Sequence, residues 1–453
     1  MERQKYYHRH IDEALTAWKN SPRHKPLLLR GARQVGKSSS VAHLAKQFEN
    51  CVEINFERKP KFMQIFQGDL DAKRIVETIT SLTGENIIPG KTLLFFDEIQ
   101  MCKEAILSLR FFWEDIPELH VIAAGSLLEF ALNEIPTFGV GRIHSMFMYP
   151  MSFDEFLGAL GMDAIRNAKW NATQDKPLQE VLHDQLVSLF RTYLMVGGMP
   201  ECVDTWVATR SYEECQYVQK EIIYTYEVDF AKYKKQANTS LLKLTLHSAA
   251  HQIGGKFVYS QVSRDYRSSQ IKEALNLLSL AGLLTPVYCT SANGFPLGAE
   301  ADERCAKYLF LDSGLLLALL GMDYGSISQI SEQILVGNAS DLVNKGHITE
   351  MVAGLEIVKY MSADHIPSLY FWMRDAKNSL AEVDYIIAKN MKILPIEIKA
   401  EVRGGMKSLY SFVESKSIHQ AVRSSLENFG KFQKDECEID IYPLYALSNL
   451  IQK

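Results

Sequence analysis

The sequence lacks the cysteine pattern of a disulfide-stapled or zinc-held fold. Its seven cysteines are odd in number and include no C-x-x-C pair, which argues against a disulfide framework and a structural zinc site. We therefore expect a reducing, cytoplasmic compartment. The chain also lacks any run of about 18 apolar residues, and its N-terminal residues, MERQKYYHRHIDEAL, contain no apolar core. We expect neither a membrane span nor a secretory signal.

Charge of one sign is not in large excess, because 49 Lys and Arg face 54 Asp and Glu and give a net charge of −5. This balance supplies no global electrostatic reason to bind nucleic acid or membrane, although it leaves a local basic face open. Hydrophobic residues make up 47% of the 453 residues, which excludes a wholly disordered chain. At roughly 100–200 residues per domain, the length predicts two to four domains.

The first third of the chain alternates predicted strands with predicted helices. This alternation indicates βαβ units and a mainly parallel sheet flanked by helices. It fades near Tyr149 and Pro150, so we predict a first domain at residues 1–150. The predicted strands are 26–30, 51–56, 91–96 and 120–124, and the predicted helices are 1–20, 38–48 and 72–80.

A phosphate-binding motif follows the first predicted strand. Residues 31–38, GARQVGKS, match G-x-x-x-x-G-K-[ST] and lead into a predicted helix. Glycines let backbone N–H groups surround phosphate oxygens, and the helix N-terminus adds positive potential. We expect Lys37 to reach the β- and γ-phosphates and Ser38 to ligate Mg²⁺, while Arg33 can contact nucleotide or a neighbouring domain. The predicted ATP-binding residues are Gly31, Ala32, Arg33, Gln34, Val35, Gly36, Lys37, Ser38 and Ser39.

Two acids end the buried strand LLFF. We expect Asp97 to bind Mg²⁺ at the carboxyl end of the sheet, and Glu98 to orient or deprotonate the attacking water. Ser126 follows another strand and fits either a contact to the γ-phosphate or an ordinary helix N-cap. Arg142 fits either an arginine finger or a surface arginine. The candidate catalytic residues are Glu98, Lys37, Arg142 and Ser126.

Residues 151–345 predict a second, helical domain. Helical patterns fill 153–235, with one interruption at VGGMP, and 241–310 predict two helices followed by short strands, as in a winged helix. Its candidate recognition helix has few basic residues, which fits packing between domains better than DNA binding. These basic residues are Arg264, Arg267 and Lys272.

Residues 346–453 predict a third domain with a group of charged residues. Glu397 and Lys399 share one face of a strand, Asp384 lies on a neighbouring strand, and Glu350 lies on the preceding helix. Carboxylates and a lysine so placed suit a Mg²⁺-dependent phosphodiesterase. The same pattern also describes a strand with one wet face and a surface ion pair. The predicted elements are a helix at 348–360 and strands at 368–373, 382–388, 393–399 and 439–444.

Seven segments of the chain together resemble one family. The segments are GARQVGKSS, LLFFDEIQ, AAGSLLEF, GRIHSMFMYPMSFDEF, YLMVGGMPE, AEVDYII and LPIEIKA. They resemble the prokaryotic AAA-like P-loop ATPases of the AAA+ superfamily whose C-terminal half is a domain of unknown function. The resemblance runs from about Lys25 to Leu447, with serine at Ser38 where relatives frequently have threonine.

The resemblance implies an α/β fold of three parts. These parts are an AAA-type ATPase core with a parallel sheet, a helical and winged-helix middle, and a C-terminal α/β domain similar to the PD-(D/E)XK restriction-endonuclease-like fold. By this similarity Glu350, Asp384, Glu397 and Lys399 occupy nuclease-type metal-site positions. Relatives with such a fold need not cut nucleic acid.

We therefore predict a Mg²⁺-dependent ATP-binding protein and ATPase whose nucleotide state controls a nuclease-like or interaction domain. Two alternatives stay open, namely an ATP-regulated metal-dependent nuclease and a non-hydrolysing nucleotide switch that binds protein or DNA. The expected cofactors are ATP and Mg²⁺. Beyond ATP and ADP, the candidate partners are DNA, RNA or a protein, with no membrane, and an oligomer stays open.

Overall fold

The structure is a computed structural model that describes residues 5–125, 128–133, 141–233, 238–321, 345–376, 379–400 and 405–453. By the density of their contacts the residues divide into two compact units. The first comprises Met1–Pro150 with the short segments Leu280–Gly282 and Ser362–Ile366. The second comprises Met151–Ser279, Leu283–Met361 and Pro367–Lys453.

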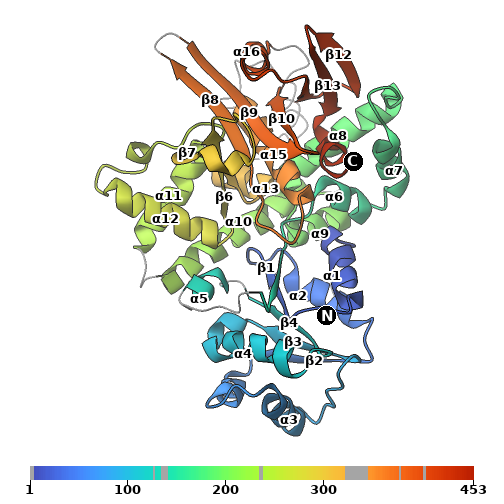
Figure 1. Cartoon of the computed structure of the whole chain (residues 1–453), viewed down its shortest axis with the longest axis vertical. Coiled ribbons are helices and arrows are strands. Elements are labelled where there is room, and N and C mark those ends of the chain that lie inside the picture. Colours follow the sequence, from blue (N-terminus) through green and yellow to red (C-terminus); the bar gives the residue numbers. More distant parts are fainter. Residues whose placement is uncertain are drawn as a thin grey trace. The chain divides into compact units, whose positions relative to one another are not determined.

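A parallel sheet forms the centre of the first unit (Figure 1). Its strands pair in the order β2-β3-β4-β1-β5, and the described pairings are parallel. The strands are β1 (Leu27–Arg30), β2 (Asn50–Asn55), β3 (Thr92–Asp97), β4 (His120–Ala124) and β5 (His144–Phe147). The helices are α1 (His10–Asn20), α2 (Lys37–Ala45), α3 (Ala72–Thr83), α4 (Lys103–Asp115) and α5 (Leu128–Asn133), with 3₁₀ turns η1 (Pro60–Phe66) and η2 (Ile99–Met101). The predicted α/β class and parallel sheet are confirmed.

The strand order places a switch point between β1 and β4. From β1 the chain continues to β2, the strand at one edge of the sheet. From β4 it continues to β5, the strand at the opposite edge. In open parallel sheets, ligands bind outside the carboxyl ends of the strands at such a point. The segment 31–36 directly follows β1 and therefore lies at this point.

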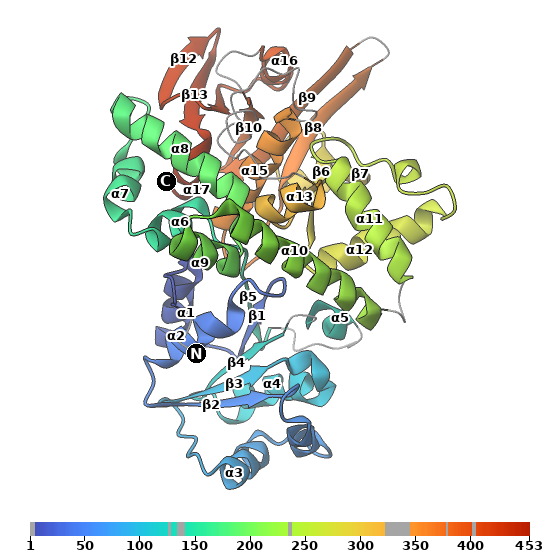
Figure 2. The same cartoon turned by 180° about the vertical axis from the view of Figure 1, so that it is seen from behind.

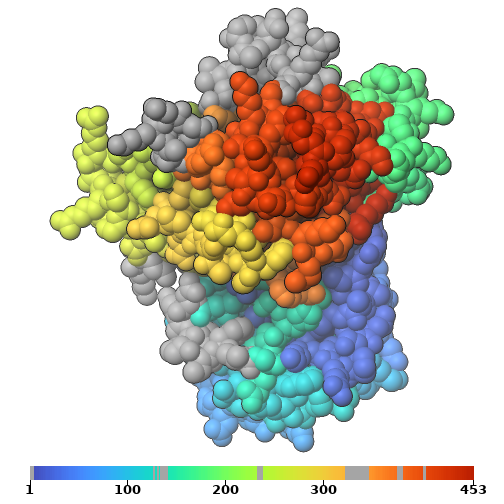
Figure 3. All heavy atoms as spheres, turned by 45° about the horizontal axis from the view of Figure 1, so that its top comes forward, coloured from blue at the N-terminus to red at the C-terminus, as the bar shows by residue number. Residues whose placement is uncertain are grey.

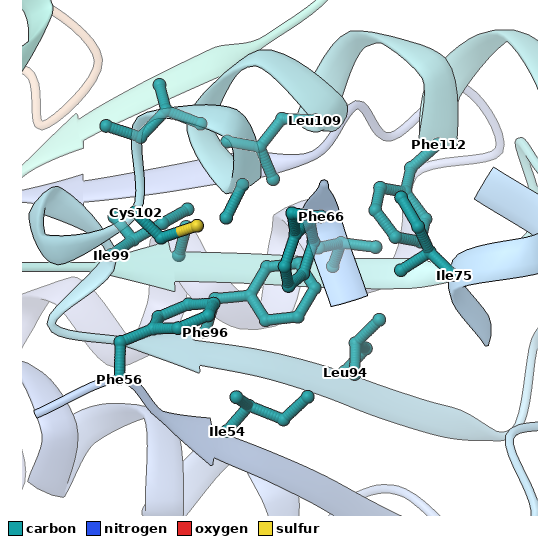
Figure 4. Close-up of a cluster of buried hydrophobic side chains, with 14 of the residues drawn as sticks. Ile54, Phe56, Phe66, Ile75, Leu94, Phe96, Ile99, Cys102, Leu109 and Phe112 are labelled. Atoms are coloured by element: carbon teal, nitrogen blue, oxygen red, sulfur yellow. The ribbon is translucent and has the colours of Figure 1, made fainter. Parts of the chain in front are cut away.

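Aromatic and branched side chains fill one face of this sheet (Figure 4). Phe96 of β3 packs against Phe66 with ring centroids 5.5 Å apart and against Phe112 of α4 at 5.9 Å. All three rings are fully buried, and burial of such a side chain stabilises a fold by about 1.5–3 kcal/mol. This core fixes β3, which ends at Asp97.

The second unit combines helices with a mixed sheet. Figure 2 shows its long helices α8 and α10 in green. The sheet order is β12-β13-β11-β10-β9-β8-β6-β7. The strands are β6 (Leu284–Thr290), β7 (Ala301–Phe310), β8 (Tyr370–Ala376), β9 (Ser379–Lys389), β10 (Lys392–Ile398), β11 (Gln420–Ser425), β12 (Gly430–Lys434) and β13 (Cys437–Pro443). The helices are α6 (Phe153–Ala159), α7 (Asp163–Asn171), α8 (Glu180–Val196), α9 (Pro200–Thr209), α10 (Tyr212–Asp229), α11 (Thr239–His251), α12 (Ser268–Leu280), α13 (Ser313–Leu319), α15 (Lys345–Tyr360), α16 (Lys407–Lys416) and α17 (Leu447–Gln452).

Strands from the middle and the C-terminal part of the chain share this sheet. The order α11, α12, β6, β7 follows the predicted order of helices and strands, but β6 also pairs in parallel with β8. In Figure 3 yellow residues of the middle part adjoin orange and red residues of the C-terminal part. The winged helix and the division at residue 346 stay predictions.

Met151 and the interruption VGGMP (residues 196–200) contact each other within the second unit. Met151 N–H donates to the Gly198 carbonyl at 2.6 Å, and Gly198 N–H donates to Asp312 Oδ2 at 2.6 Å. A Cβ on Gly198 would lie 2.0 Å from the Met151 carbonyl oxygen, so this approach requires glycine. The interruption between α8 and α9 therefore holds the start of α6.

Among the described residues, no helix combines the length and the apolar character that a membrane crossing requires.

Candidate functional site

The loop after β1 has the backbone of a phosphate-binding loop. Gly31, Gln34 and Gly36 have φ angles of 140°, 64° and 101°, which turn the chain back before α2 begins at Lys37. A Cβ on Gly31 would lie 2.2 Å from the Met148 carbonyl oxygen, so glycine is required there. Such alternation of backbone conformation presents successive N–H groups to an anion.

The ammonium of Lys37 lies inside this loop. Its Nζ donates to the carbonyl oxygens of Gly31 at 2.9 Å and Ala32 at 2.7 Å, and the side chain is buried. Burial lowers the pKa of Lys37 to about 8, although the carboxylates of Glu98 and Asp97 oppose the change. Phosphate oxygens are stronger acceptors than these carbonyls and would compete for the same donor.

Ser38 and Asp97 lie side by side at the carboxyl ends of the strands. The Ser38 hydroxyl donates to Asp97 Oδ1 at 3.2 Å, and Asn55 Nδ2 donates to Oδ2 at 2.9 Å. Burial, followed by the charge of Glu98, raises the pKa of Asp97. Sequence reasoning missed Asn55, although a polar residue at the carboxyl end of the neighbouring strand β2 was an available signal.

Glu98 follows Asp97 in a left-handed backbone conformation, with φ of 51°. Its Oε2 accepts a hydrogen bond of 2.6 Å from Gln100 Nε2. A Cβ on Gly125 would lie 1.9 Å from Gln100 Oε1, so Gln100 reaches the carboxyl end of β4. Strained backbone of this kind costs about 1–3 kcal/mol and concentrates at functional sites. Gln100, which the sequence did not single out, holds the Glu98 carboxylate.

The N-terminal segment contacts the loop, which the sequence did not indicate. Arg9 donates to the Val35 carbonyl at 2.9 Å and to the Tyr149 carbonyl at 2.7 Å. Tyr6 stacks on His43 of α2 with ring centroids 4.3 Å apart. These contacts fix the loop from outside the motif.

The remaining predicted residues of this site fall into three groups. Ser126 lies outside the described residues. Arg142 is half-exposed and forms an ion pair of 2.5 Å with Glu114 of α4. Val35 and Ala32 are buried, whereas Gln34 and Ser39 are exposed and Arg33 is half-buried.

A second charged cluster lies in the second unit. Carboxylate oxygens of Glu350 on α15 and of Glu382 and Asp384 on β9 lie within 4.8 Å of one another. Lys307 of β7 donates to Glu350 Oε1 at 2.7 Å and also to Glu382. Burial raises the pKa of Glu350 well above its ordinary value, and the charge of Asp384 raises it further, although Lys307 opposes the change. The structure thus brings together the predicted Glu350 and Asp384.

Glu397 and Lys399 form a pair next to this cluster. Lys399 Nζ donates to Glu397 Oε1 at 2.6 Å, and the Ile398 N–H donates to Asp384 Oδ2 at 2.7 Å. Burial, followed by the charge of Asp384, raises the pKa of Glu397 to about 7. Sequence reasoning missed Glu382 and Lys307. The two-residue spacing from Asp384 was a signal for Glu382, but no local pattern assigns Lys307 to these carboxylates.

The two sites differ in how they fit a divalent cation. Ser38 and Asp97 offer hard oxygen donors side by side, which fits Mg²⁺. Among Glu350, Glu382 and Asp384, two of the three carboxylates already bind the ammonium of Lys307. Lys307 thus takes up acceptor oxygens that a metal bound by this cluster would use.

The pKa of about 8 for Lys37 predicts proton uptake when nucleotide binds. At pH 8 about half of the nucleotide-free chains carry a neutral Lys37, whereas phosphate charge favours the ammonium form. Binding of Mg·ATP should therefore take up about half a proton at pH 8 and almost none at pH 6, and affinity should fall as the pH rises from 7 to 9. Calorimetry in buffers of different ionisation enthalpy measures this uptake. A binding enthalpy that is independent of the buffer at pH 8 would contradict it.

A parallel sheet with this loop at its switch point and an acidic pair at the end of β3 defines a P-loop nucleotide-binding domain. Residues 23–157 match the family described as AAA domain. The match covers most of the first unit, from β1 to β5, and extends to the start of α6. Residues 187–326 and 345–447 match two domains of unknown function, DUF8612 and DUF4143.

Solved structures of low sequence identity also resemble the chain. The Walker-type ATPase PABY2304 of Pyrococcus abyssi has 14% identity, with 70% of this chain and 97% of that chain covered and a TM-score of 0.45. The Aeropyrum pernix ORC1 protein in complex with DNA has 12% identity, with 70% and 94% covered and a TM-score of 0.30. A search of curated proteins found no match. The domain assignment rests on the strand order and the AAA match.

Proposed function

We propose that the protein binds Mg·ATP at residues 31–39, which form the loop after β1 and the start of α2, and hydrolyses it. We further propose that its nucleotide state controls the second unit as an interaction domain. The observation that carries the proposal is the convergence of Lys37, Ser38, Asp97 and Glu98 at the carboxyl edge of the sheet. The Ser38 hydroxyl and the Asp97 carboxylate are 3.2 Å apart there.

Each of these side chains has a role that its position supports. Lys37 exchanges the carbonyls of Gly31 and Ala32 for oxygens of the β- and γ-phosphates. The Glu98 carboxylate accepts a proton from the attacking water, and Gln100 holds that carboxylate in place. Ser38 and Asp97 are the residues that would hold Mg²⁺, which when bound neutralises charge on the phosphates. Asn55 keeps Asp97 oriented.

The experiment that tests the proposal is phosphate release by the full chain. We expect release from ATP in Mg²⁺ and its loss in excess EDTA, because the phosphates then lose their counter-charge. Restoration by added Mg²⁺ is the control. Absence of release together with tight retention of nucleotide would instead favour the non-hydrolysing switch.

The proposed role of the second unit is to bind a protein partner, while nucleic acid and self-association stay alternatives. Arg264, Arg267 and Lys272 are exposed, but they are fewer than the roughly 6–10 phosphate contacts of strong DNA binders. The alternative nuclease at Glu350, Asp384, Glu397 and Lys399 requires a metal among carboxylates. Lys307 already binds Glu350, so the interaction role has more support.

A further inference from the structure

Lys307 is a buried cation without a role in the nucleotide site. Its side chain is only 2% exposed, and its Nζ donates to Glu350 Oε1 at 2.7 Å and to Glu382. The ammonium also lies 4.9 Å from the ring centroid of Phe371. The three partners come from α15, β9 and β8, so Lys307 reaches from β7 into a cluster built by distant parts of the chain.

The partners of Lys307 are the groups that a divalent cation would use. Glu350, Glu382 and Asp384 form a group of carboxylates with the spacing of a metal site, and Glu397 lies nearby with its Oε2 buried and without a hydrogen-bond partner among the described residues. Buried carboxylates need a cation or protons to offset their mutual repulsion. Lys307 supplies one positive charge at the position between Glu350 and Glu382.

A lysine fixed on a strand has an advantage over a free metal ion. The ammonium is held next to its partners by the backbone, so it competes at a high effective concentration. Mg²⁺ must also give up tightly held water before carboxylates can bind it directly. The Phe371 ring favours an ammonium further.

We propose that Lys307 is the resident cation of this cluster and excludes divalent metal from it. The cluster is then an internal ion network that joins β7, β9 and α15, and Lys307 determines which cation it accepts. The inference concerns a site separate from the nucleotide loop and does not depend on ATP hydrolysis.

Binding of Mn²⁺ to the nucleotide-free full chain, followed by the electron paramagnetic resonance signal of free Mn²⁺, tests this proposal. Wild type and Glu350→Gln should bind the same amount of Mn²⁺. Lys307→Met should bind about one additional Mn²⁺ per chain that wild type does not bind, because Glu350 and Glu382 lose the cation that pairs with them. Adding Glu350→Gln to Lys307→Met should remove this gain.

Lys431→Met is the matched control, because Lys431 forms a 2.8 Å ion pair with Asp175 outside the cluster. It should bind Mn²⁺ as wild type does. Far-UV circular dichroism checks folding, and Lys307→Gln, which can still hydrogen-bond the carboxylates, replaces a Lys307→Met chain that fails to fold. Binding by wild type that Glu350→Gln abolishes would overturn the proposal. A folded Lys307 variant without additional Mn²⁺ would overturn it equally.

Discussion

Replacing Lys37 with alanine is expected to weaken Mg·ATP binding by about 100-fold or more. The ammonium lies inside the loop and donates to the Gly31 and Ala32 carbonyls. Charge-assisted hydrogen bonds contribute about 1.5–3 kcal/mol each, and every 1.4 kcal/mol changes affinity tenfold. Equilibrium binding of a fluorescent ATP analogue measures the loss.

The matched control for this change is Lys46→Ala. Lys46 is exposed and lies directly after α2, the helix that Lys37 begins. It should bind ATP as wild type does. Tight ATP binding by a folded Lys37→Ala chain would show that this loop is not the ATP-binding site.

Replacing Glu98 with glutamine is expected to lower the rate of ATP hydrolysis by about 100-fold or more while ATP affinity changes little. A positioned general base contributes roughly 10²–10⁴-fold, and glutamine keeps the shape of the side chain without its basicity. The left-handed backbone at Glu98, with φ of 51°, is equally strained for both residues. Steady-state phosphate release and ATP binding, measured on the same preparation, separate the two effects.

Glu104→Gln is the control for Glu98→Gln, because Glu104 is exposed in the first turn of α4. Its phosphate release should equal that of wild type. Equal rates for Glu98→Gln and wild type would show that another group activates the water.

Local patterns predicted much of the first unit. The predicted strands 91–96 and 120–124 correspond to β3 (Thr92–Asp97) and β4 (His120–Ala124). Parallel strands that are buried on both faces are continuous apolar runs. Their positions can therefore be predicted from the sequence without knowledge of the fold. Position at the end of such a strand was sufficient to place Asp97 beside Ser38.

The strands of the C-terminal part were harder to predict from local sequence patterns. Strand β11, Gln420–Ser425, is mostly polar by residue type yet largely buried, and neither it nor β12 was predicted. Strand β6 lies between β7 and β8, a pairing that depends on residues far apart in the chain. For the same reason Lys307 could not be assigned to Glu350, because their contact joins a strand and a helix 43 residues apart.

A single-turnover experiment tests the central claim most directly. An excess of nucleotide-free chain is mixed with γ-labelled ATP and Mg²⁺, and bound ATP and released phosphate are counted over time. We expect that wild type converts bound ATP to phosphate, that Glu98→Gln retains uncleaved ATP, and that Lys37→Ala retains almost none. Wild-type chain that neither retains nor cleaves ATP would contradict the account.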